Sequence, residues 1–383
     1  MIPLAVPNLS GNEGRYLQEC VQSTFVSTVG PFVTRLEEMV AASAGGSGAV
    51  ATSAGTAALH AALLAVGVRP GDLVILPSFT FIASANAVAH CGATPWLMDA
   101  DPFRWTLDPN QLESLLENEA EVIGKDLYRR ACGRRVAAIL PVFTLGIAPE
   151  MDAINAIAKR FGLPVIADAA AAIGVQVGGE PVTAAADLVC FSFNGNKTVT
   201  SGGGGAVAGR DANLLKRVRH LTTTARISTD YTHDMVGYNY RMTNIEAAVG
   251  VAQLEQLDTF LAAKRRIRKG YDDAFRGMPG VELFPEVSED ENVCWFSGVV
   301  LDADVHPSVK TVCDKLREAG VEGRTFWRPI HTQPPFVTAP RGAMDVVDGL
   351  WGRVLTLPCS TSLTEADQAK VIDALTGILR RTA

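Results

Sequence analysis

The sequence contains no apolar run approaching the roughly eighteen residues that a membrane-spanning helix requires. Its first residues, MIPLAVPNLSGNEG, also lack the basic and long apolar segments of a secretion signal. A surplus of basic residues is missing too: the formal net charge is -7 at pH 7, so the chain has no bulk positive surface for nucleic-acid phosphates. We therefore expect a cytoplasmic protein with no membrane partner and no nucleic-acid partner.

Cysteine and histidine motifs are absent as well. The seven cysteines are an odd number and widely scattered, with no CxxC pair. The six histidines show neither HExxH nor another metal-ligand spacing, and no GxSxG motif occurs. These absences argue against a metal site and against serine hydrolysis, and they predict reduced cysteines in the core.

The chain instead shows short apolar strands alternating with helical stretches. Segments such as 72–78, 163–169 and 187–193 are strand-like, and residues 151–162 have helical periodicity. This alternation predicts an α/β fold with a mainly parallel sheet and helices on both faces. It fades after the long helical stretch that starts at residue 244, which predicts a large domain at 1–255 and a smaller α+β domain at 256–383.

A polar loop with one lysine follows a buried strand in DLVCFSFNGNKTVTSGGGGAVAG. Lys197 is the only charged residue between Asp187 and Arg210. We expect it at the carboxyl edge of the sheet, where open α/β sheets bind ligands. Burial there would lower the pKa of the amine and allow it to form a Schiff base. A solvated loop lysine and a plain glycine turn are the alternatives.

An acid ends the apolar strand in PVIADAAAAIG. The carboxylate of Asp168 can face the protonated pyridine nitrogen of pyridoxal 5'-phosphate (PLP) and keep that ring an electron sink. The alternative is the N-cap of a helix formed by the alanines. We expect one helix and one strand between Asp168 and Lys197, which would let both side chains reach one crevice.

A third candidate lies in ATSAGTAALHAAL. Ser53, Gly55 and Thr56 precede a helix whose N-terminal amides and dipole favour an anion such as the cofactor phosphate. An ordinary capped helix is the alternative.

Taken together, these residues resemble the DegT/StrS family of PLP-dependent sugar aminotransferases, which have the fold-type I architecture. The resemblance covers essentially the whole chain, because the following motifs occur in the family's order: SAGTAAL, GDLVILPSFTFIASANAV, GATPWLMDAD, IADAAAAIG, FSFNGNKTVTSGGGG, YNYRMTNIEAAVGVAQL, FWRPIHTQPPF and LTLPCSTSLTEAD. The segments FNGNK, GGGG and HLTTTAR look most like the branch that acts on UDP-linked 4-keto-6-deoxy-N-acetyl sugars of the bacillosamine or legionaminic type.

The resemblance also implies roles for individual residues. Lys197 would carry the cofactor and Asp168 would face its pyridine nitrogen. The remaining implied contacts are Phe81 stacked on the ring; Gly55, Thr56 and Ser192 at the phosphate; Asn239 at the phosphate of the neighbouring subunit; and Ser27, Thr28, Arg324 and His331 near the substrate. The Asn239 contact implies a homodimer with shared active sites.

The implied reaction has two stages. An amino acid, L-glutamate by resemblance, converts PLP into pyridoxamine phosphate (PMP), and the keto sugar then receives the amino group for a cell-surface glycan. Lys197 moves the proton in both stages. A PLP-dependent sugar dehydratase is an alternative, although those relatives look to have histidine in place of Lys197, and a non-catalytic PLP-binding sensor is another.

Three positions depart from the family's common pattern. Ala171 stands where many relatives have Gln, His or Glu, Asn194 where His is frequent, and Gly203 where Glu is frequent. Alanine offers no side-chain hydrogen bond to the cofactor's phenolic oxygen, so we expect the tuning of the cofactor and the sugar pocket to differ from those of other members.

Overall fold

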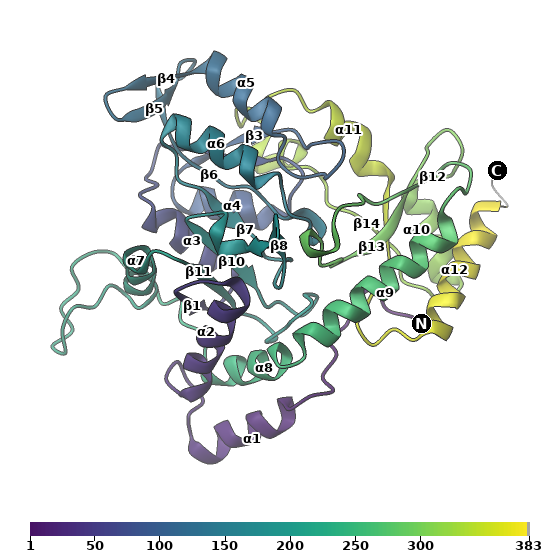
Figure 1. The fold of residues 1–383 in the computed structure, drawn as a ribbon, viewed down its shortest axis with the longest axis horizontal. Coiled ribbons are helices and arrows are strands. Elements are labelled where there is room, and N and C mark those ends of the chain that lie inside the picture. The colour runs from purple at the N-terminus through teal and green to yellow at the C-terminus, as the bar shows by residue number, and fades with distance from the viewer. Residues whose placement is uncertain (381–383) are drawn as a thin grey trace.

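One mixed sheet forms the centre of the computed structural model, which describes residues 1–380 (Figure 1). Its strands are β1 (Gly48–Thr52), β2 (Leu73–Pro77), β3 (Thr94–Met98), β6 (Arg134–Ile139), β7 (Ile166–Asp168), β10 (Leu188–Ser192) and β11 (Gly205–Gly209). Two ladders, β3-β2-β6 and β7-β10-β11-β1, are joined by parallel bridges from Ile139 to Val165 and from Val142 to Asp168. Only β11 runs antiparallel to its neighbours among these strands, which confirms the predicted mainly parallel sheet.

Helices cover both faces of this sheet, as predicted. One layer consists of α2 (Pro31–Ala44), α5 (Pro109–Glu119), α6 (Met151–Phe161) and α8 (Asn244–Leu254), and the other of α3 (Gly55–Ala65), α4 (Ile82–His90) and α7 (Ala212–Thr222). Successive residues of each strand join opposite cores: Ile75 packs under the first layer, whereas Val74 and Leu76 pack under the second. The strands are apolar throughout because both faces are buried.

A second sheet follows the long helix α9 (Leu257–Phe275), which runs diagonally between the two parts (Figure 1). It is antiparallel in the order β12 (Val281–Leu283), β13 (Ser297–Leu301), β15 (Val354–Leu357) and β14 (Arg324–Thr325), and it packs with α10 (Val309–Glu318) and α12 (Glu365–Arg380). The predicted boundary at residue 255 stays a prediction. Ile2 bridges to Val321 beside this second sheet, whereas Ile330 and Phe336 pack under the central one.

Several short elements complete the fold. The hairpin β4 (Ala120–Ile123) and β5 (Asp126–Arg129) extends β6, β8 (Gln176–Val177) pairs with β9 (Glu180–Pro181), and α1 (Glu13–Ser23) and α11 (Asp345–Leu350) lie at the periphery. Within residues 1–380, none of the helices combines the length and the apolarity that crossing a membrane demands.

The glycines before β11 allow a close approach that positions the site. A Cβ at Gly205 would lie 2.6 Å from the carbonyl oxygen of Phe191 and 2.7 Å from the amide nitrogen of Gly55. Gly204 has φ +89°, a conformation that residues with side chains rarely adopt. The strand can therefore pass directly beside the start of α3.

Candidate active site

A cavity of about 280 Å³ lies where several strands of the central sheet end. Its wall includes the six residues of one chain that are predicted to contact the cofactor: Gly55, Thr56, Phe81, Asp168, Ser192 and Lys197. They come from the start of α3, the start of α4, the end of β7, the end of β10 and the loop that follows β10. The structure therefore brings the predicted cofactor contacts of one chain into one place.

Asp168 lines this cavity and is only 5% exposed. Ser84 Oγ donates to its Oδ2 at 2.7 Å, and the amide of Ala170 donates to its Oδ1 at 3.1 Å. Burial raises the pKa of the Asp168 carboxyl, while these two hydrogen bonds and the charge of Lys197 act in the opposite direction. A positively charged partner within the cavity would therefore stabilise the carboxylate.

Two expectations about the surroundings of Asp168 are wrong. The alanines after it form turns and not a helix, so the carboxylate caps no helix. The segment that leads to Lys197 holds the β8–β9 hairpin, a short 3-10 turn and β10, where we expected one helix and one strand. The glycine pair Gly178 and Gly179, both with positive φ, makes the hairpin turn that replaces the helix.

Lys197 lies in the turn after β10, where its amide donates to the carbonyl of Asn194 at 3.0 Å. Desolvation by the cavity wall lowers the pKa of its amine to about 8, and the charge of Asp168 opposes this shift. Near neutral pH a usable fraction of the amine is therefore unprotonated, as a nucleophile requires. The alternative of an ordinary solvated lysine does not fit this position.

The part of the cavity wall at the start of α3 suits an anion. Ala54 precedes α3 and no side chain caps this helix, so the first amides, at Gly55 and Thr56, face the cavity without the side-chain partner that an ordinary capped helix would have. Ser192 lies against Gly55, because a Cβ there would be 2.7 Å from the Cβ of Ser192. A phosphate placed here would meet two amides, a hydroxyl and the positive end of α3.

A comparison with known families identifies the family of the chain. The model of the DegT/DnrJ/EryC1/StrS aminotransferase family matches residues 7–376. The chain belongs to this family. It is therefore an aminotransferase that uses PLP and PMP as its cofactor forms, and the fold-type I architecture is confirmed.

Individual relatives agree with this assignment. The aminotransferase is 38% identical to the GDP-perosamine synthase of Caulobacter vibrioides over 99% of this chain and 98% of that protein. It is 32% identical to the UDP-2-acetamido-2-deoxy-3-oxo-D-glucuronate aminotransferase of Pseudomonas aeruginosa, over 91% of each chain. A crystal structure of a DegT DnrJ EryC1 StrS aminotransferase from Brucella abortus has 28% identity and a TM-score of 0.85, covering 96% of this chain and 95% of that one.

The residues that line the cavity of the aminotransferase fit PLP by their chemistry. The wall contains a carboxylate, an amine and an uncapped helix start. Phe81, 53% exposed, supplies an aromatic wall and lies 5.8 Å from Trp327, measured between ring centroids. These features match the pyridine nitrogen, the aldehyde, the phosphate and the ring face of the cofactor.

The three unusual positions of the aminotransferase line the same cavity. Ala171, Asn194 and Gly203 all belong to its wall. The Asn194 side-chain amide donates to Asn196 Oδ1 at 3.3 Å, which orients it along the turn that carries Lys197. These three departures from the common family pattern therefore lie together in the candidate cofactor cavity.

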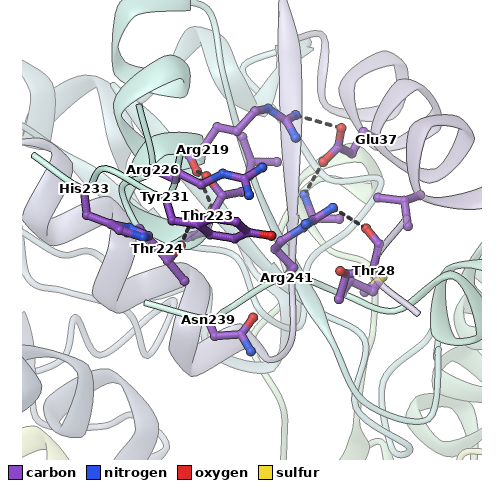
Figure 2. A pocket seen from close by; sticks show the side chains of 15 residues that line it. Thr28, Glu37, Arg219, Thr223, Thr224, Arg226, Tyr231, His233, Asn239 and Arg241 are labelled. Carbon is purple, nitrogen blue, oxygen red and sulfur yellow. Dashed lines mark hydrogen bonds and ion pairs between the residues drawn. The ribbon is translucent and has the colours of Figure 1, made fainter. Parts of the chain in front are cut away.

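Thr28 and Asn239 lie elsewhere, in a second cavity of about 470 Å³ (Figure 2). Arg241 donates to the backbone oxygen of Thr28 at 2.5 Å. The backbone oxygen of Ser27 accepts a hydrogen bond from the backbone amide of Asn244 at 2.6 Å. Within one chain these residues do not reach the cavity of Lys197, so their roles remain predictions.

Two further residues that we predicted to contact the substrate also lie outside the cavity of Lys197. Arg324 is on the edge strand β14, exposed, and pairs with Glu322 at 2.7 Å. His331 is turned inward, with Nδ1 2.7 Å from Ser78 Oγ and Nε2 3.0 Å from Asp348. The positions of these two side chains do not support direct contact with a substrate bound in the cavity of Lys197.

Sequence reasoning missed three wall residues. Ser84, Trp295 and Trp327 all line the cavity. Trp327 belongs to the quoted segment FWRPIHTQPPF, whose family position was a usable signal. Trp295 and Ser84 carry no local motif, and only the folded chain shows that they meet Lys197 and Asp168. Across residues 1–380, no group of three His, Cys, Asp or Glu side chains is arranged to hold a metal ion.

Proposed function

We propose that this aminotransferase moves an amino group from an amino acid, L-glutamate, to the keto carbon of a nucleotide-linked 4-keto-6-deoxy sugar. The observation that carries the proposal is the placement of Lys197 and Asp168 in one cavity beside the uncapped start of α3. Relatives whose names specify GDP-linked and UDP-linked sugars support the substrate class.

Each residue of the cavity has a chemical task in this proposal. PLP, when bound, supplies an electron sink for the carbon that loses or gains a proton. The Asp168 carboxylate holds the proton on the ring nitrogen, Phe81 packs against the ring, and the α3 amides with Ser192 bind the phosphate. Lys197 would carry the cofactor at rest. It would move a proton from the donor carbon to the cofactor carbon C4′ in the first half of the reaction, and from C4′ to the sugar carbon in the second.

The identity of the nucleotide on the sugar is the most specific part of the proposal. The motifs FNGNK and GGGG favour a UDP-linked N-acetyl sugar, whereas 38% identity over nearly the whole chain links this protein to a GDP-perosamine synthase. We infer that a GDP-linked 4-keto-6-deoxy sugar is the first substrate to test and its UDP-linked N-acetyl counterpart the second. In either case we propose that the amino sugar is made in the cytoplasm and is then used to build a cell-surface glycan.

A homodimer with shared active sites is part of the same proposal. The segment 226–237 projects from the body beside α7 (Figure 1) and exposes Ile227, Met235 and Val236. Phe25 and Val29, near the second cavity, are exposed as well. Exposed apolar patches often mark protein–protein interfaces. We infer that these side chains belong to the dimer interface, where Asn239 in the second cavity would face the phosphate bound by the other subunit.

The second cavity also has the charge that a nucleotide diphosphate requires. Arg219, Arg226 and Arg241 line it (Figure 2). Arg219 pairs with Glu37 at 2.7 Å, while Arg226 lies 5.3 Å from the ring of Tyr231. In a dimer these cations would add binding energy for the diphosphate at the partner's site.

The test is the visible spectrum of the purified protein before and after L-glutamate, followed by GDP-, UDP- and dTDP-linked 4-keto-6-deoxy sugars. The proposal predicts a yellow protein that bleaches with glutamate and regains its colour with one of the keto sugars. A protein that binds cofactor but ignores amino donors would favour the sensor alternative. Release of water from a sugar without amino transfer would favour the dehydratase.

A further inference from the structure

Trp295, which precedes a strand of the second sheet, contacts Lys197, which follows a strand of the central sheet. Trp295 lies just before β13 and is 1% exposed. The Nζ atom of Lys197 is 3.8 Å from the centroid of its ring, and its indole Nε1 donates to the backbone oxygen of Asn196 at 2.8 Å. One side chain therefore contacts both the reactive amine and the backbone next to it.

Trp295 is itself held from several sides. Its amide donates to the carbonyl of Leu145 at 3.1 Å, and its carbonyl accepts at 2.9 Å from Lys264, a buried lysine of α9. Cys294 before it has φ +51°, a left-handed conformation that residues with a Cβ seldom adopt. Such a backbone persists only where its surroundings enforce it, so the main chain that carries Trp295 is held in place.

We propose that Trp295 is a positioning residue whose ring face holds the side chain of Lys197 whenever the lysine is not bonded to the cofactor. This proposal rests on the proposed function. The proposed transfer frees this lysine in every cycle, and an aromatic face attracts an ammonium group. Asp168 is the only other titratable residue in the described cavity wall and acts on the lysine from β7. Without the ring, the ammonium form of the freed lysine would lose an attractive partner that an apolar aliphatic side chain cannot replace.

The charge on Lys197 in the cofactor-free protein measures this contact directly. The pH dependence of its acetylation by acetic anhydride, followed by mass spectrometry of the peptide that contains it, gives the pKa of the amine without any turnover. The variants are Trp295→Leu, which removes the aromatic face, and Trp295→Phe, which keeps a face but loses Nε1. Trp105→Phe is the matched control, because Trp105 is a buried tryptophan outside this cavity.

We expect the titration midpoint of Lys197 to fall by about one pH unit in Trp295→Leu, because the ammonium form loses its aromatic partner. It should stay near the wild-type value in Trp295→Phe and in the control. We also expect kcat to fall about tenfold in Trp295→Leu, with the KM of the amino donor unchanged. If Trp295→Leu does not fold, fluorinated tryptophans at position 295 keep the shape of the ring and should lower the midpoint stepwise.

An unchanged or raised midpoint after loss of the aromatic face would overturn the proposal, because Trp295 would then supply burial alone. This failure is distinct from failure of the proposed function. Borohydride reduction of the wild-type holoenzyme should fix the cofactor on Lys197, and a different attachment point would refute the proposed function whatever the variants show.

Discussion

At the scale of single residues, Lys197 and Asp168 form a pair whose environments shift their pKa values toward one another. Desolvation lowers the pKa of the lysine to about 8 and raises the pKa of the acid. The cavity therefore disfavours charge on both groups until a cofactor with its own charges is bound. This arrangement fits a site built around a charged cofactor.

The first prediction concerns Lys197→Ala. The variant should retain PLP by its phosphate and ring contacts but lose about a thousandfold or more of kcat, because it lacks the group that carries the cofactor and moves the proton. Borohydride should leave the cofactor unattached. The measurement is steady-state amino transfer with glutamate, and near-normal turnover by this variant would contradict the assignment.

The second prediction concerns pH. The folded-state pKa of Lys197 lies below the ordinary lysine value, so the reactive neutral amine increases as pH rises through about 8. The rate of covalent loading of PLP onto cofactor-free protein should rise about tenfold from pH 6.5 to 7.5 and level off above pH 8.5. Stopped-flow absorbance checks this, and a rate that keeps rising beyond pH 9.5 would show an unshifted lysine.

The sequence predicts the place of a residue well when the residues next to it in the chain determine that place, and poorly when distant residues do. Lys197, Asp168 and the Gly55–Thr56 pair stand at strand ends or at a helix start, where the local pattern fixes their place. Trp295 meets Lys197 through a contact between the two sheets, which no periodicity encodes. His331 has a recognisable motif, but the partners that turn it inward, Ser78 and Asp348, are distant in sequence.

At the scale of elements, α3 is the helix that we propose to bind the cofactor phosphate. Its start lies against Ser192 at the end of β10 and against Gly205 of β11, because neither Gly55 nor Gly205 carries a Cβ. Local patterns predicted such elements well: 72–78 contains β2 and 187–193 contains β10. The β4–β5 and β8–β9 hairpins were not predicted, because their short mixed sequences lack a clear alternation of apolar and polar residues.

The third prediction tests the start of α3. In Gly55→Ala the new Cβ would lie 2.7 Å from the Cβ of Ser192, so the amides must move away from the phosphate. The Kd for PLP should rise about ten- to a hundredfold, which corresponds to the loss of one or two hydrogen bonds to a charged group. Fluorescence titration of cofactor-free protein measures the Kd. Gly349→Ala, where an added Cβ meets nothing within 4 Å, is the matched control.

At the scale of the whole molecule, the fold separates the predicted contacts into two cavities. One holds Lys197 and Asp168, and the other holds Asn239 and Thr28. The sequence predicted both sets but could not show that a single chain keeps them apart. A dimer is the arrangement that would bring the second cavity of one chain to the first cavity of another.

The fourth prediction follows from that sharing. Lys197→Ala and Asn239→Ala should each be weakly active alone, but a mixture refolded or co-expressed in equal amounts should regain about one quarter of wild-type activity. Half of the dimers formed at random are hybrids, and one of the two sites in each hybrid has both native residues. Activity no greater than the average of the two single variants would show that each chain contains its own complete site.

The most direct test of the account is the fate of the amino nitrogen. The purified holoenzyme is incubated with ¹⁵N-labelled L-glutamate and the keto sugar identified by the spectral test, and both products are analysed by mass spectrometry. The account predicts one ¹⁵N in each molecule of amino sugar and one 2-oxoglutarate formed for each label transferred. A sugar product without ¹⁵N, or 2-oxoglutarate formed without an aminated sugar, would contradict it.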